Sequence, residues 1–174
     1  PNSILIFHKI TKENLFKKLT LTIKMKNLQQ LKQQYKVLQS EIKARLQDFK
    51  QVKKQQYFYE ACFCILTPQS QAKKCWQAIE KLKELDFKNN NIKPKKVLQT
   101  RTRFHNHKSN YLLELKQNWN KIARAQNSIK NNKELRKYLA NNIKGFGLKE
   151  ASHYLRNTGK ENLATLDRHI LKNL

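Results

Sequence analysis

Acidic residues are scarce in this sequence, which holds 12 Asp and Glu against 37 Lys and Arg in 174 residues. The formal net charge at pH 7 is therefore +25. A surplus of this size predicts a polyanionic partner, either a nucleic acid or an anionic membrane surface. Because Lys, Asn, Gln and Ile are all abundant, a biased codon composition is the alternative source of part of this surplus.

Long hydrophobic runs are absent, and no segment approaches the about 20 apolar residues that a membrane-spanning helix needs. The apolar stretch at 4–7 is too short for the core of a signal peptide, and no cleavage site follows it. We therefore expect a nucleic acid rather than a membrane as the partner. The expected location is the cytoplasm, in association with the nucleoid.

Cysteine is also rare, with Cys62, Cys64 and Cys75 as its only occurrences. An odd number of cysteines in apolar surroundings predicts reduced thiols packed in the core of a cytoplasmic protein. Their spacing matches no zinc pattern, so we expect no metal site. The letters HNH at 105–107 are read as a chance match, since a metal nuclease needs flanking strands and further ligands.

Strand patterns are missing as well, whereas apolar residues recur three or four apart along most of the chain. This predicts an all-α fold, an orthogonal helical bundle of about seven to nine short helices in one domain or two small lobes. Pro68 is expected to end a buried helix, and Ser70 to cap the next one. We expect a loop at 89–91, a short helix after Pro94 and an interruption at 101–108. The expected helical faces lie within 28–49, 57–66, 75–82, 111–122 and 135–143.

Only three glycines occur, and two of them, Gly145 and Gly147, lie in the stretch IKGFGLKEASHYL at 143–155. Helical patterns on both sides predict a helix-hairpin-helix. We expect both glycines to adopt positive φ angles and to let backbone N–H groups face an anion, such as a nucleic-acid phosphate. An ordinary tight turn between two helices is the alternative.

Lys149 falls in the first turn of the helix that follows this hairpin. The helix dipole, the surrounding cations and partial burial are all expected to favour the neutral amine, which is a nucleophile. A solvated surface lysine is the alternative in a chain so rich in this residue.

Asp167 precedes the run Arg168–Leu174, and its position predicts a helix N-cap. A carboxylate near such an amine has a second use. It can stabilise the cationic sugar that forms when a glycosidic bond breaks, or accept the proton of the amine.

Four motifs carry a family resemblance: KGFGLKEASHYLRN, LDRHIL, FCILTPQSQAKKCW and RTRFHNHKSNYL. Together they resemble the helix-hairpin-helix DNA glycosylase superfamily. Within it, the resemblance is to the archaeal and bacterial type of 8-oxoguanine DNA glycosylase/lyase, the second Ogg family, and it covers roughly residues 35 to 174. It implies base-excision repair of double-stranded DNA containing oxidised guanine, by a bifunctional enzyme that acts as a monomer.

The resemblance also implies roles for single residues. Lys149 matches the nucleophile that attacks C1′ of the damaged nucleotide, expels the base and forms a Schiff base, from which β-elimination nicks the strand 3′ to the lesion. Asp167 matches the essential aspartate. No cofactor is implied beyond a monovalent cation at the hairpin. The implied DNA-binding residues are Lys144, Gly145, Phe146, Gly147, Arg103, Phe104 and Arg168.

Arg103 and Phe104 fall where the family faces the gap that a flipped base leaves, and there they would offset lost stacking. A core aromatic is the alternative for Phe104. The family continues beyond the position of Leu174, and residues 1–24 resemble nothing in it. We therefore expect an N-terminal extension at 1–24 and a C-terminally truncated glycosylase domain at 25–174.

Two other functions stay open, and a third is disfavoured. A non-catalytic or impaired helix-hairpin-helix module would only bind DNA. An RNA-associated basic protein is supported by charge alone. The relative endonuclease III has cysteines for an iron–sulfur cluster after its aspartate, whereas no cysteine follows Cys75 here.

Overall fold

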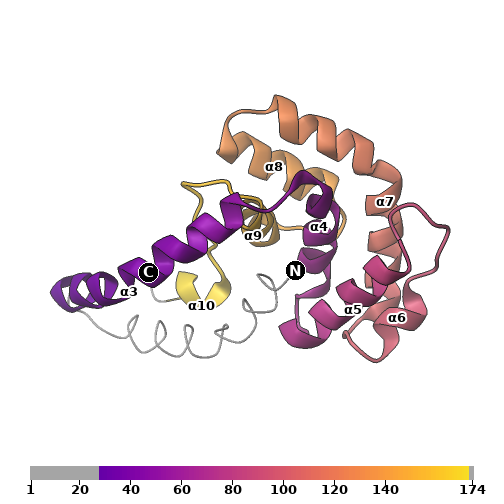
Figure 1. Cartoon of the computed structure of the whole chain (residues 1–174), viewed down its shortest axis with the longest axis horizontal. Coiled ribbons are helices and arrows are strands. Elements are labelled where there is room, and N and C mark those ends of the chain that lie inside the picture. Colours follow the sequence, from indigo (N-terminus) through magenta and orange to yellow (C-terminus); the bar gives the residue numbers. More distant parts are fainter. Residues whose placement is uncertain (1–27, 173–174) are drawn as a thin grey trace. The chain divides into compact units, whose positions relative to one another are not determined.

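The computed structural model describes residues 28–172, and all regular secondary structure in that range is helical (Figure 1). The predicted all-α class is therefore confirmed, while the expected extension at 1–24 lies outside the described residues. The helices are α3 (Leu28–Lys50), α4 (Tyr57–Leu66), α5 (Ala72–Glu84), α6 (Lys95–Gln99), α7 (His105–Ser128), α8 (Asn132–Asn142), α9 (Leu148–Asn157) and α10 (Arg168–Leu171), with a 3-10 helix at Lys54–Gln56.

The chain divides into two compact units. The larger unit is Val52–Thr165, and the described part of the smaller unit comprises residues 28–51 and 166–172. Helix α3, in the smaller unit, was predicted from its apolar spacing, but the expected burial of that face is wrong for much of its length. Leu31, Tyr35 and Leu46 are 46%, 48% and 39% exposed, whereas Phe49 is buried. Periodicity predicted the helix but not what covers it.

Helix α4 forms the centre of the larger unit, as its unbroken apolar run predicted. Every residue from Glu60 to Leu66 is buried, and the helix packs against α5, α7 and α9. The ring of Phe58 meets Trp119 of α7 edge-on, with centroids 5.3 Å apart, and lies 6.0 Å from Phe87. These contacts bury a helix that has no polar face to turn toward water.

The segment after α4 is partly as expected. The predicted core face of α5, made of Cys75, Trp76, Ile79 and Leu82, is buried, and so are the other two cysteines. Ser70, however, does not cap α5, because the N-cap is Gln71 and no side chain bonds the first turn. Its hydroxyl accepts hydrogen bonds from distant parts of the chain instead.

Helix α7 begins earlier than expected. The predicted interruption at 101–108 is wrong beyond Phe104, because α7 starts at His105. The segment lacks an apolar pattern because its buried side chains, Thr102 and Lys108, are polar. The loop at 89–91 and the short helix after Pro94 are confirmed.

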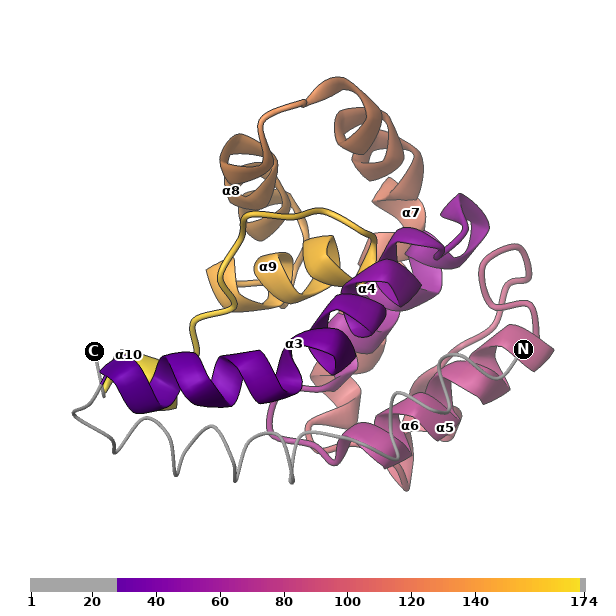
Figure 2. The same ribbon diagram turned by 60° about the vertical axis from the view of Figure 1, so that its left-hand side comes forward.

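Helices α8 and α9 form the predicted pair around the hairpin, and α9 packs against both α8 and α4 (Figure 2). Asn131 caps α8 by accepting from the N–H groups of Lys133 and Glu134. The hydroxyl of Tyr154 in α9 donates a hydrogen bond to the side chain of Gln126 in α7 at 2.8 Å. The hairpin is thus attached to the core through α9, which is buried from Ala151 to Leu155.

One carboxyl group, that of Glu60, is buried between α4 and α9. Glu60 of α4 accepts a hydrogen bond from the side chain of Asn157 in α9 at 3.1 Å. Burial raises the pKa of Glu60, while the Asn157 bond and the positive charges of Lys83 and Arg156 act in the opposite direction. Because burial dominates, the pKa of Glu60 is higher in the folded protein than in the unfolded chain, so the folded state binds a proton there more readily.

We therefore predict that Glu60→Gln removes a pH-dependent loss of stability. A raised folded-state pKa contributes stability below the unfolded-state pKa and loses it as pH rises through the folded-state value. The glutamine keeps an oxygen for Asn157 and has no charge to bury. Thermal melts from about pH 4 to pH 7 should show the variant gaining on the wild type as pH rises. A melting-temperature difference that stays constant over this range would contradict the prediction.

Candidate functional site

The turn at 143–147 joins α8 to α9 and requires glycine at its centre. Gly145 has φ of +87°, as predicted. A Cβ atom at this position would lie 2.8 Å from Cδ2 of Tyr111 in α7, which is closer than real side chains approach. The turn closes with a hydrogen bond from the N–H of Phe146 to the carbonyl of Ile143 at 3.0 Å. Backbone conformation and close packing on α7 both select glycine here.

Gly147 differs from the prediction, because its φ of −108° and ψ of −173° are extended and open to any residue. It is the N-cap of α9, and its N–H donates to the carboxylate of Glu150 at 3.0 Å. This is the backward half of a capping box, in which an acid three residues on satisfies the N-cap amide. A carboxylate of the chain itself therefore already occupies one of the amides expected to face an external anion.

The side chains around the turn point in different directions. Phe146 is buried, with its ring centroid 6.0 Å from that of Tyr154, so it anchors the turn from inside. Only its backbone is available to a ligand at the surface. Lys144 is exposed and is the cation that the turn itself presents.

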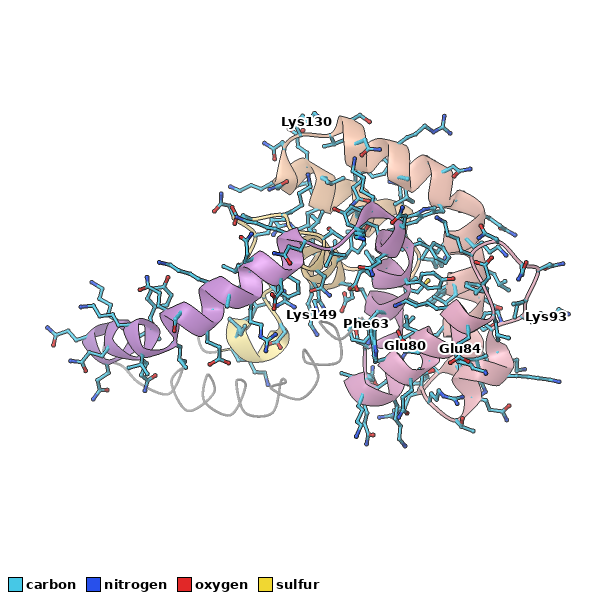
Figure 3. The ribbon with its side chains drawn as sticks, in the orientation of Figure 1. Phe63, Glu80, Glu84, Lys93, Lys130 and Lys149 are labelled. Carbon is cyan, nitrogen blue, oxygen red and sulfur yellow. The ribbon has the colours of Figure 1, made fainter. Side chains whose placement is uncertain are left out.

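Lys149 is the second residue of α9, in the first turn as predicted, and Figure 3 shows its side chain there. The expected partial burial is wrong, because Lys149 is exposed. The adjacent Glu150 folds back on Gly147 and so does not cover the amine from that side. What the fold presents is a primary amine at a helix N-terminus, open to a large ligand.

Asp167 belongs to the smaller unit. Its Oδ1 accepts from the N–H of Ile170 at 3.0 Å, and its carbonyl accepts from Leu171 at 2.9 Å. The predicted N-cap role is confirmed for α10, whose first residue is Arg168. The side chain of Asp167 is only half-buried, so part of it stays exposed to solvent while it caps α10.

Arg103 and Phe104 form an exposed pair immediately before α7. Phe104 is 50% exposed, and its backbone is left-handed, with φ of 57° and ψ of 35°. The guanidinium of Arg103 lies over its ring, 5.4 Å from the centroid. The alternative of a core aromatic is therefore wrong. Phe104 thus combines an exposed ring with a left-handed backbone that L-residues avoid. Packing of the core does not explain either feature.

Two residues near this pair were missed by the sequence analysis. Lys108 is buried and donates three hydrogen bonds, and Gln69, in the α4–α5 turn, is exposed with φ of 54°. Residue type alone does not distinguish Lys108 from the rest of the 37 cationic residues. A weak signal did exist for both, because Lys108 interrupts an apolar face and Gln69 follows a proline.

Within residues 28–172, no helix combines the length and the apolarity needed to cross a membrane. The same part of the chain brings together no group of three His, Cys, Asp or Glu suited to a metal ion. The fold and the site thus define a helix-hairpin-helix protein with an exposed lysine after its hairpin.

Comparison with known proteins narrows this class. The sequence model of the 8-oxoguanine DNA glycosylase family matches residues 42–174. A relative from Fusobacterium nucleatum, named 8-oxoguanine DNA glycosylase/AP lyase, is 42% identical over 152 residues, which cover 80% of this chain and 70% of the relative. The chain therefore belongs to the 8-oxoguanine DNA glycosylase family.

Solved structures agree with this assignment. The crystal structure of the Methanocaldococcus jannaschii 8-oxoguanine DNA glycosylase matches with a TM-score of 0.70 and 31% identity, over 90% of this chain and 72% of that one. A second structure of the M. jannaschii glycosylase/lyase, in complex with a 15mer DNA containing 8-oxoguanine, matches with a TM-score of 0.66 and 31% identity. That match covers 78% of this chain and 67% of the other.

The two hairpin glycines should differ sharply on substitution. Gly145→Ala is expected to lower the free energy of unfolding by about 2 kcal/mol or more, because it combines a left-handed φ with a clash on Tyr111. Gly147→Ala, its matched control, should cost less than about 1 kcal/mol, the loss of a favoured N-cap residue. Urea unfolding of both variants measures the difference, and equal losses would contradict the geometry described here.

Proposed function

We propose that this protein is a base-excision repair enzyme that removes 8-oxoguanine from duplex DNA and cleaves the strand at the resulting abasic site. Two facts support the proposal: membership of the glycosylase family and an exposed amine in the first turn after the hairpin. The solved relative bound to 8-oxoguanine DNA supports DNA as the partner. The net charge of +25 favours binding to its phosphates.

Lys149 is the proposed nucleophile. Its Nζ, as the free amine, attacks C1′ of the damaged nucleotide while the bond from C1′ to the base breaks, and the base leaves with the electron pair and gains a proton. Opening of the sugar ring then gives a protonated Schiff base. Loss of a proton from C2′ allows the 3′ phosphate to leave by β-elimination. This chemistry needs an amine that a large substrate can reach, and Lys149 is exposed.

Asp167 is the proposed partner in the charge changes of this reaction. A carboxylate can accept the proton that the lysine ammonium must lose before its amine attacks, and it can stabilise positive charge that develops on the sugar. Its Oδ1 is held by the amide of Ile170, which fixes the carboxylate at the start of α10. We assign it a catalytic role beyond capping.

The hairpin is the proposed grip on the DNA backbone. Lys144 supplies an exposed charge, and the turn around Gly145 and Gly147 brings main-chain atoms to the surface. Phe146 would contribute only through its backbone, because its ring is buried. A monovalent cation at the turn and a phosphate contact by Arg168 belong to the same proposal.

Arg103 and Phe104 are proposed to enter the gap that an extruded base leaves. Extrusion costs a few kcal/mol of stacking and pairing, and an inserted aromatic with its cation offsets part of that cost. The exposure of Phe104 and the cation over its ring support this role. We further propose that the protein acts as a monomer on nucleoid DNA in the cytoplasm.

Borohydride trapping on a duplex containing 8-oxoguanine tests the nucleophile. Wild-type protein should form a covalent adduct with DNA, and Lys149→Ala should lower its yield by several orders of magnitude. Lys133→Ala is a matched control, because Lys133 is also an exposed lysine at the second position of a helix and is likewise followed by Glu. It should leave the adduct unchanged. Asp167→Asn, which keeps an oxygen for the cap, should slow trapping by about 10²- to 10⁴-fold.

The same experiment separates the alternatives. Salt-sensitive DNA binding with no adduct from any variant would favour a helix-hairpin-helix module that only binds DNA. An adduct that survives Lys149→Ala but is lost in Lys133→Ala would move the nucleophile to α8 and contradict the assignment.

Phe104→Ala should weaken the reaction only where a base must leave a duplex. We expect it to lower the single-turnover rate on duplex 8-oxoguanine DNA by about tenfold, in line with the worth of stacking one base on an aromatic ring. Trapping on a single-stranded abasic oligonucleotide should stay within about twofold of the wild type, since no base is extruded. Equal losses on both substrates would show that Phe104 supports the fold rather than base extrusion.

A further inference from the structure

A buried ammonium joins three parts of the larger unit. Nζ of Lys108, in the first turn of α7, donates to the carbonyl oxygens of Leu66 and Pro68, both at 2.8 Å, and to the hydroxyl of Ser70 at 2.9 Å. Lys108 is 5% exposed. These three oxygens are neutral, and that of Leu66 lies at the C-terminus of α4, where the helix dipole favours a cation.

The hydroxyl of Ser70 is the point at which this network reaches the exposed Arg–Phe pair. Besides Lys108, it accepts from the backbone N–H of Arg103 at 3.0 Å. Ser70 therefore links the α4–α5 turn to the residue immediately before Phe104. Neither bond caps a helix, so neither is explained by the local structure of the turn.

Both segments that meet at Ser70 carry a residue in the left-handed region. Gln69 has φ of 54° and Phe104 has φ of 57°, and each is adjacent in sequence to one end of the Ser70–Arg103 hydrogen bond. A non-glycine residue in this region is strained and persists only where its surroundings hold it. The bonds from Arg103 and Lys108 to Ser70 contribute to this restraint, beside the backbone bond from the N–H of Lys108 to the carbonyl of Phe104 at 3.0 Å.

We propose that Ser70 and Lys108 are positioning residues that hold Arg103 and Phe104 in the conformation that enters DNA. The inference rests on the proposed function, in which this pair fills the space of an extruded base. Lys108 fixes the hydroxyl of Ser70, and the hydroxyl fixes the backbone of Arg103. Of these four residues, only Arg103 and Phe104 touch the substrate, so loss of the network acts on the rate of base extrusion through Phe104.

A double-mutant cycle tests the route of this effect. Ser70→Ala should lower the single-turnover rate on duplex 8-oxoguanine DNA by about three- to tenfold, the equivalent of one net hydrogen bond. In a Phe104→Ala background the same change should have no further effect, because the residue through which Ser70 acts is gone. Ser70→Thr keeps the hydroxyl and should restore the rate. Ser128→Ala removes an exposed serine hydroxyl of α7 and is the matched control.

A second measurement needs no DNA. Amide hydrogen exchange of the peptide that covers residues 101–104 should be faster in Ser70→Ala than in the wild type or Ser70→Thr. If Ser70→Ala does not fold, as judged by thermal melting, Ser70→Cys takes its place. Its sulfur would lie where the hydroxyl oxygen lies but accepts hydrogen bonds only weakly. Lys108 itself is left intact, because its removal would take one donor from three oxygens at once.

The outcomes separate this inference from the proposed function. Rate losses by Ser70→Ala that are equal in both backgrounds, or unchanged exchange at 101–104, overturn the positioning role while wild-type trapping still succeeds. A wild-type protein that forms no adduct overturns the proposed function itself. Equal losses on duplex and on single-stranded abasic DNA also overturn the positioning role, because they mark a general loss of structure.

Discussion

Burial of α4 on all sides is the constraint on which the larger unit depends. Helices α5, α7 and α9 cover it, and two of them, α7 and α9, each bring one functional feature to a fixed place. Helix α9 begins at the hairpin and carries Lys149, and α7 begins at the exposed Arg103–Phe104 pair. Because these helices contact the same buried rod, the lysine and the aromatic are held by one continuous core. A loss of packing at α4 would therefore disturb both at once.

The hairpin depends on two separate contacts, one on each side of its turn. Gly145 lies against the ring of Tyr111, so α7 fixes the outer side of the turn. Phe146 packs on Tyr154, so α9 holds it from within. The hairpin is thus part of the core rather than a loop resting on it. Its accessible features are Lys144, main-chain atoms and, one turn further, Lys149.

Sequence reasoning succeeded where the signal is local and failed where it depends on residues far away in the chain. Apolar spacing predicted the helices, and the paired glycines predicted the hairpin. The same spacing could not show that Leu31 and Tyr35 are exposed, because periodicity does not reveal what covers a face. Serine is a typical N-cap residue, but the hydroxyl of Ser70 accepts hydrogen bonds from residues 33 and 38 positions away. Gly147 was assigned a positive φ because glycine permits one, whereas the chain uses it as an extended N-cap.

The left-handed backbone of Phe104 has a thermodynamic consequence for encounters with a ligand. An unfolded chain seldom visits this conformation, so the unfavourable ordering of the segment is completed when the protein folds. The ordering therefore lowers the stability of the native state and does not lower the affinity for a partner. A segment whose backbone is already ordered loses little further backbone entropy on contact with a ligand, so binding needs no folding step there.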